Sequence, residues 1–207
     1  MTGKLLPTST PIEAVSFPMH QPIRVSCVDA ANPFIFVSAE DLGLVGTESV
    51  SVLHELVGAT LMEIRAIMSV RMGLALTIDA AKLVMGTPKI AVVGPARDYM
   101  ASSGRLVPAA STDIWVRAYS MGKPHPSIPM TGAVCVGAAA SIPGTLVHTI
   151  VAGSVTAGAV NIGHAGGTMA VTGRSRMEGD EVVVDCGSVY RTARRLMEGK
   201  VMYIAAD

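Results

Sequence analysis

Two segments of the sequence combine residue types and spacings that could bind a small acid. The first, Ser120-Met121-Gly122-Lys123-Pro124-His125, leads into an apolar run that has Thr131 and Gly132 near its start. A helix beginning at Thr131 would offer unpaired N–H groups and a partial positive charge, and glycine would let a carboxylate approach the backbone closely. With Lys123 and His125 just upstream, these residues predict an anion-binding helix N-terminus. The alternative is that Thr131 only caps a core helix.

The second segment is a glycine-rich turn, Gly163-His164-Ala165-Gly166-Gly167, between two predicted strands. Its free N–H groups could form an anion nest, although it matches neither a Walker loop nor a dinucleotide-binding fingerprint. The alternative is an ordinary hairpin whose histidine lies at the surface. Asn32, at the end of another predicted strand, offers a donor and an acceptor that suit a ligand carboxylate, but Asn-Pro is also a common turn start.

Cysteine and histidine spacings give little support for nucleophilic or metal chemistry. Cys27, Cys135 and Cys186 are best explained as packing residues, because each lies in an apolar or strand-like run and no C-x-x-C pair is present. The five histidines include no H-x-x-x-H pair, so we expect no metal site.

Composition argues against several classes of protein. The formal net charge is zero, so no basic surplus favours nucleic acid. No apolar run reaches the roughly 18–20 residues of a membrane-spanning helix, and the N-terminus lacks the apolar core of a signal peptide. Half of the 207 residues are hydrophobic, enough for a core in one large domain or two small ones. We therefore expect a cytoplasmic protein without nucleic-acid or membrane partners.

Hydrophobic periodicity predicts an α+β fold in which strands surround one buried helix. Apolar residues at three- and four-residue spacing predict an amphipathic helix over residues 51–71, capped by Ser49 or Ser51 and ended by Gly73. Residues 131–141 are apolar on every side and predict a helix buried all round. Loops are expected over residues 98–107 and 121–129, an extended arm over residues 1–19, and strands over residues 23–28, 34–38, 89–93, 113–120, 146–151, 160–163, 168–174, 182–189 and 200–204.

These segments, taken together and in order, resemble the PrpF family along almost the whole chain. The landmarks that carry the resemblance are Thr2-Gly3-Lys4-Leu5-Leu6-Pro7-Thr8, Val28-Asp29-Ala30-Ala31-Asn32-Pro33, Arg71-Met72-Gly73-Leu74, Ser120-Met121-Gly122-Lys123, Thr131-Gly132-Ala133, Ile142-Pro143-Gly144-Thr145 and Ile162-Gly163-His164. The resemblance implies the diaminopimelate-epimerase fold, in which each of two lobes curls a mostly antiparallel sheet around a central apolar helix. In that fold the ligand binds between the lobes and faces both helix N-termini.

The resemblance covers only the C-terminal half of a family member. It therefore implies a single lobe, residues 21–207, preceded by an extended arm at the former lobe junction, residues 1–20. It also implies a cofactor-independent isomerase that shifts a proton and a double bond in a small polycarboxylate such as aconitate or methylaconitate. The lysine to which the family's proton transfer is ascribed belongs to the missing lobe, which leaves Lys123 and His125 as the catalytic candidates here.

Carried over by position, the resemblance also implies a set of residues that bind the substrate carboxylates. They are Asn32, Ser120, Met121, Thr131, Gly132, Gly163, His164, Gly166 and Gly167. No metal and no cofactor is implied. A second copy in a homodimer, or a separate N-terminal lobe, would complete the site. The alternative is a carboxylate-binding lobe or truncated remnant without activity of its own.

Overall fold

A large mixed sheet organises the computed structural model, which describes residues 2–17, 21–152, 158–179, 181–190, 194–200 and 202. Its strands are β1 (Glu13–Val15), β2 (Ile23–Asp29), β3 (Pro33–Ser38), β4 (Lys89–Pro95), β7 (Ile114–Ser120), β8 (Lys123–Pro124), β9 (Ala159–His164), β10 (Gly167–Glu178) and β11 (Glu181–Val189). The strand order is β1-β2-β3-β4-β7-β9-β10-β11, with β8 paired to β7. Neighbouring strands run antiparallel except in the pairs β3–β4 and β7–β9, which are parallel.

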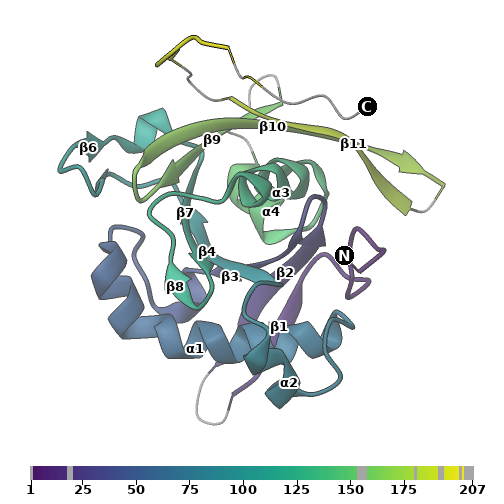
Figure 1. Ribbon diagram of the computed structural model, residues 1–207. Coiled ribbons are helices and arrows are strands. Elements are labelled where there is room, and N and C mark those ends of the chain that lie inside the picture. The colour runs from purple at the N-terminus through teal and green to yellow at the C-terminus, as the bar shows by residue number, and fades with distance from the viewer. Residues whose placement is uncertain are drawn as a thin grey trace.

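Helices cover both faces of this sheet because its central strands are apolar on both sides. They are α1 (Val50–Arg71), α2 (Ile78–Leu83), α3 (Met130–Ser141) and α4 (Leu146–Val151), with one-turn 3-10 helices at Glu40–Leu42 and Ala109–Ser111. Figure 1 shows α1 and α2 on one side of strands β2, β3, β4 and β7, and α3 and α4 on the other. The predicted α+β class is therefore confirmed as a large sheet with few helices.

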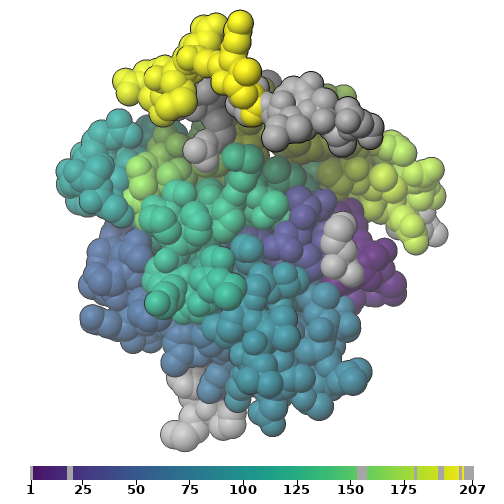
Figure 2. Space-filling view, in the orientation of Figure 1, coloured from purple at the N-terminus to yellow at the C-terminus, as the bar shows by residue number. Residues whose placement is uncertain are grey.

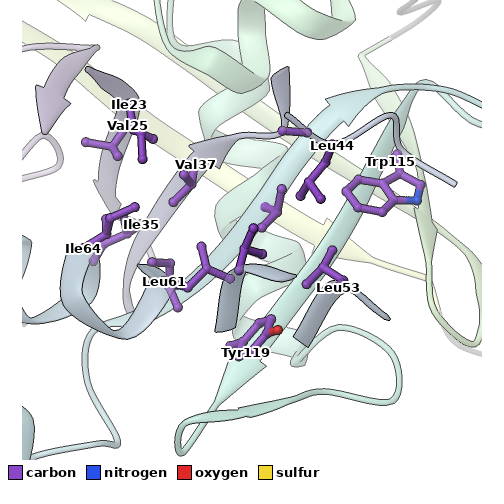
Figure 3. Close-up of a cluster of buried hydrophobic side chains, with 14 of the residues drawn as sticks. Ile23, Val25, Ile35, Val37, Leu44, Leu53, Leu61, Ile64, Trp115 and Tyr119 are labelled. Carbon is purple, nitrogen blue, oxygen red and sulfur yellow. The ribbon is translucent and has the colours of Figure 1, made fainter. Parts of the chain in front are cut away.

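Side-chain alternation along the strands separates two buried cores. Trp115 and Tyr119 of β7 face α1 and belong to one core, whereas Val116 between them belongs to the other core, around α3. Figure 3 shows the first of these, the α1-side core, in which Leu61 and Ile64 of α1 pack against strand residues. The second is called the α3-side core. Strand β7 contributes to both.

Strands β10 and β11 pass over α3, so the helix lies between them and the rest of the sheet (Figure 1). Buried residues occur on every side of α3, as the sequence predicts. A Cβ on Gly137 of the helix would lie 2.7 Å from the Thr172 carbonyl oxygen, and one on Gly173 would overlap the Gly137 carbonyl oxygen. The contact between α3 and β10 is therefore a contact of two backbones, which only glycine permits.

Most of the predicted elements are confirmed. Helix α1 begins after Ser49, whose side chain accepts a hydrogen bond from the Val52 N–H, and it is followed by Gly73, whose φ is 71°. Strands β2, β3, β4, β7, β9, β10 and β11 coincide with predicted strands. The strand predicted over residues 200–204 lies outside the described residues except for Lys200 and Met202.

Three local predictions are wrong, and helix α2 is missed. The loop predicted over residues 121–129 contains the two-residue strand β8, because Lys123 and Pro124 pair with the end of β7. Residues 146–151 form helix α4 instead of a strand, because Thr145 caps it by accepting from the His148 N–H. Six residues are too few for periodicity to separate the two states. Residues 98–107 form a hairpin of β5 (Tyr99–Met100) and β6 (Leu106–Val107) instead of a loop, because both Tyr99 and Val107 are buried.

Part of the predicted N-terminal arm packs on the sheet. Strand β1 pairs with β2, and the Asp29 N–H donates to the Leu5 carbonyl oxygen at 2.9 Å. The Thr2 hydroxyl donates to the Asp29 carboxylate at 2.8 Å. Within the described ranges, none of the helices combines the length and the apolar content needed to cross a bilayer. The same residues contain no group of three or more His, Cys, Asp or Glu side chains placed to hold a metal ion.

Candidate functional site

Helix α3 begins without a side-chain cap. Its N-cap is Pro129, whose carbonyl oxygen accepts from the Ala133 N–H at 2.9 Å. Thr131, predicted as the N-cap, is instead the second helical residue, because Pro129 already has the extended backbone of a cap position. Thr131 is exposed and Gly132 is buried, so α3 begins at the molecular surface and enters the core within its first turn. The other α-helices in the described part of the chain are capped by Ser49, Thr77 and Thr145.

The turn between β2 and β3 packs beside this helix. The Cys135 thiol, in the second turn of α3, donates to the Asn32 carbonyl oxygen at 3.1 Å. Burial raises the pKa of Cys135, which keeps it a neutral thiol and agrees with a packing role. A Cβ on Gly132 would lie 2.6 Å from Phe34 Cε2, so glycine is needed for α3 to lie this close to β3. Asn32, Thr131 and Gly132 are therefore brought together around the first two turns of α3.

The loop between β8 and α3 connects the start of α3 to the glycine turn (residues 163–167). The Pro126 carbonyl oxygen lies 3.1 Å from the position that a Cβ on Gly166 would take. His125 is half-buried, and its Nδ1 accepts from the Ser127 N–H at 3.1 Å, which leaves Nε2 for a ligand. Figure 2 shows this loop, coloured green, on the surface of the molecule. His125 and the glycine turn are thus neighbours.

The glycine turn connects β9 to β10 and is held by residues from two other elements. The Tyr99 hydroxyl lies 2.8 Å from the His164 carbonyl oxygen and 2.6 Å from the Gly167 carbonyl oxygen. Arg117 Nη1, from β7, donates to the Gly163 carbonyl oxygen at 3.3 Å. The glycine turn is therefore held by two buried side chains, Tyr99 and Arg117, instead of projecting freely into solvent.

The His164 side chain is buried and uncharged at neutral pH. It is 6% exposed, and its Nδ1 accepts from the Gly166 N–H at 3.1 Å. Burial lowers its pKa to about 4, and the positive charge of Arg117 acts in the same direction. The alternative of a surface histidine is therefore wrong. Contact between His164 and a substrate stays a prediction, and such a contact would supply a hydrogen bond without a positive charge.

The protein is expected to lose stability as the pH falls from 6.5 to about 4. Over this range the unfolded chain binds a proton at His164 that the folded chain excludes, so protonation favours unfolding. The complete effect of this group is of order 3 kcal/mol. Urea titrations of wild type and His164→Gln, at neutral pH and near pH 4, measure it. The free energy of unfolding should fall less in the variant, and an identical fall in both proteins would contradict the expectation.

The β7–β8 hairpin carries the remaining predicted residues, Ser120, Met121 and Lys123. Ser120 pairs with Lys123, and Met121 between them has a φ of 54°. Gly163 pairs with Trp115 near the start of β7. Strand β9 runs parallel to β7, so the glycine turn continues from Gly163 in the direction of the hairpin. None of the described hydrogen bonds joins Ser120, Met121 or Lys123 to the glycine turn, whereas Pro126, next to His125, packs against Gly166.

Sequence reasoning missed three residues near the glycine turn. Arg117 is only 4% exposed, and its guanidinium carbon lies 4.5 Å from the ring centroid of Tyr99 and 4.4 Å from that of Trp115. Burial lowers the pKa of Arg117 to about 10, so it remains a cation at neutral pH. Arg105 Nη2 lies 3.6 Å from where a Cβ on Gly167 would stand. An arginine inside an apolar strand was the available signal for Arg117; Tyr99 and Arg105 gave none.

Comparisons with known proteins point to one family. The profile of the PrpF protein family matches residues 1–204. A 2-methyl-aconitate isomerase from Cupriavidus necator is 39% identical over 201 residues, which are 96% of this chain and 50% of that protein. A 3-methylitaconate isomerase from Eubacterium barkeri is 36% identical over 205 residues, which are 97% of this chain and 52% of that protein.

A solved structure gives the same result in three dimensions. The crystal structure of a methylitaconate-delta-isomerase matches with a TM-score of 0.82 at 36% sequence identity, over 96% of this chain and 51% of that one. This chain spans about half the length of the curated relatives that it matches. Because the family profile covers nearly all of its residues, the chain belongs to the PrpF family.

Proposed function

We propose that this chain supplies the carboxylate-binding half of an isomerase that shifts a proton and a double bond in a small polycarboxylate of the aconitate or methylaconitate type. The uncapped N-terminus of α3 is the observation that carries the proposal, because its first-turn N–H groups have no side-chain acceptor of their own. Relatives named as 2-methyl-aconitate and 3-methylitaconate isomerases support the class of substrate.

The proposal includes a fold relationship and a division of the chain. Residues 21–207 are one lobe of the diaminopimelate-epimerase type, and residues 1–20 are the arm at the lobe junction. The position of α3 between β10 and the central strands supports this relationship. In such a lobe the start of the central helix is the point at which a ligand meets the backbone.

The reaction moves one proton and leaves the number of electrons unchanged. A base removes a proton next to a substrate carboxylate, and the electron pair moves toward that carboxylate to form a dienolate. An acid then returns a proton at the other end of the allylic system, so the double bond shifts and no cofactor is consumed. The N–H groups of α3 stabilise the negative charge that accumulates on the carboxylate. His125, whose Nε2 is not engaged by Ser127, and Lys123 are the candidates for proton transfer.

A second lobe completes the site in this proposal, because the chain spans about half the length of its relatives. A second copy of the chain, paired with the first around a two-fold axis, or an N-terminal lobe would supply the other side of the site. The half-length match also supports a second candidate function, in which the chain binds polycarboxylates without converting them.

If two copies of the chain complete the site, the isomerase proposal predicts that the protein alone exchanges a substrate proton with solvent. Protein incubated with cis-aconitate in D₂O is expected to incorporate deuterium and to form an isomer, both measured by NMR. If His125 transfers the proton, His125→Gln should slow incorporation by about 100-fold or more. The matched variant His148→Gln, on α4, should keep the wild-type rate.

Calorimetric titration with tricarballylate, an inert tricarboxylate, separates the two candidate functions. Binding without deuterium incorporation supports the carboxylate-binding lobe. If the protein shows no binding of tricarballylate and no deuterium incorporation, both candidate functions are contradicted. Light scattering with and without tricarballylate then shows whether the binding species contains one copy or two.

A further inference from the structure

The β5–β6 hairpin and β7 supply hydrogen-bond donors to most carbonyl groups of the glycine turn. The Tyr99 hydroxyl is within reach of two of them, on His164 and Gly167, at 2.8 and 2.6 Å. The other bonds run from the Ser102 N–H (2.8 Å) and hydroxyl (3.1 Å) to the Ala165 carbonyl oxygen, and from Arg117 Nη1 (3.3 Å) to the Gly163 carbonyl oxygen. The carbonyl oxygens of the turn therefore face the β5–β6 hairpin and β7.

These bonds also decide where the N–H groups of the turn point. In a trans peptide, the carbonyl of one residue and the N–H of the next point in opposite directions, and the peptides of this turn are trans. Because the carbonyls of Gly163, His164 and Ala165 face the hairpin and β7, the N–H groups that follow them face away. One of these, on Gly166, bonds to His164 Nδ1. His164 pairs with Gly167 in the β9–β10 ladder, so the Ala165 N–H is the donor that faces away without a described partner, and a carboxylate can accept from it.

We propose that Tyr99 is a positioning residue that, together with Arg117, holds the glycine turn in its carboxylate-binding orientation; the inference rests on the function proposed above. Tyr99 is 3% exposed, so no water replaces its hydroxyl as the donor. Burial raises its pKa, and the hydroxyl stays protonated at neutral pH. The Arg117 guanidinium lies against the Tyr99 ring and keeps the hydroxyl aimed at the turn.

Tyr119 provides a matched control for a test of this role. It is 1% exposed and belongs to the same α1-side core as Tyr99. Its hydroxyl lies 3.4 Å from His54 Nδ1, on α1, and makes no contact with the glycine turn among the described hydrogen bonds. Tyr99→Phe and Tyr119→Phe therefore each remove one buried hydroxyl from one core. Only the first removes a support of the turn.

Hydrogen exchange measured by mass spectrometry, on peptides that cover residues 159–172, tests the positioning role directly. Tyr99→Phe is expected to speed exchange in the glycine turn about tenfold and to weaken tricarballylate binding by a similar factor, because a buried acceptor loses its donor. Where turnover is measurable, KM should rise by that factor while kcat changes little. Tyr119→Phe should alter neither exchange in the turn nor binding, even if it lowers the melting temperature equally.

Two results would overturn the inference. One is unchanged exchange of the turn in Tyr99→Phe. The other is equally faster exchange in both variants, which would mean general loosening of the core. If wild type fails to bind tricarballylate, the proposed function is contradicted instead, and the exchange measurement still decides whether Tyr99 holds the turn.

Discussion

Replacing Gly173 with alanine is expected to lower the free energy of unfolding by about 3 kcal/mol, the upper part of the usual range for overpacking. The added Cβ would overlap the carbonyl group of Gly137 and lie 2.7 Å from the Ala138 nitrogen. All of these are backbone atoms, which cannot rotate out of the way as a side chain does. Relief requires β10 to move away from α3, and that movement opens the α3-side core.

Gly199→Ala is the matched control for this prediction. A Cβ there has no atom of the described residues within 4 Å, and neither glycine is among those with a positive φ. The two variants therefore differ in the space around the added Cβ, and neither needs a positive φ. Urea denaturation measures both, and a midpoint for Gly173→Ala equal to that of wild type would show that α3 and β10 do not make this contact.

Thr131→Asp is expected to weaken tricarballylate binding by at least tenfold and to stabilise the fold slightly. The new carboxylate stands in the first turn of α3, where a negative charge interacts favourably with the helix dipole by about 0.3–1 kcal/mol. A ligand carboxylate at the same helix end would meet a like charge at close range. At about 4 Å and the effective dielectric constant typical of a protein surface, this repulsion is roughly 4 kcal/mol.

The opposite signs of the two effects make this variant informative. A simple folding defect would lower stability and binding together, whereas this variant should separate them. Thr131→Asn has nearly the same shape without the charge, and it should bind tricarballylate within a few-fold of wild type. Calorimetry and thermal melting of both variants provide the comparison. Equal affinity of the aspartate and asparagine variants would show that the ligand does not bind at the start of α3.

Much of the fold was predictable because long elements repeat their pattern. Helix α1 shows several turns of apolar spacing and has a serine cap and a following glycine, so its type and bounds could both be inferred. Helix α4 has only six residues, and its decisive signal is the cap formed by Thr145. The β5–β6 hairpin has strands of two residues each, which are too short to show any alternation.

The candidate site was predictable only where its residues are close in sequence. The segment from His125 to Gly132 can be recognised from its order, because a loop that enters a helix places its residues near the helix N-terminus. The supports of the glycine turn come from far away in the chain. Tyr99 is separated from His164 by 65 positions, and Arg117 from Gly163 by 46. Such pairings arise from the order of strands in the large sheet and from the packing of the separate β5–β6 hairpin, and one sequence reveals neither.

Strand β7 contributes side chains to both cores, which links the stability of one core to that of the other. Its successive side chains enter opposite layers, so we expect unfolding of one core to loosen the other. The glycine turn rests on Tyr99 and Trp115 of one layer, and the start of α3 rests on Phe34 of the other. A ligand held at both places would fasten the two layers to each other. Ligand binding would then stabilise α1, on the far side of the sheet, and its backbone hydrogen bonds would open less often.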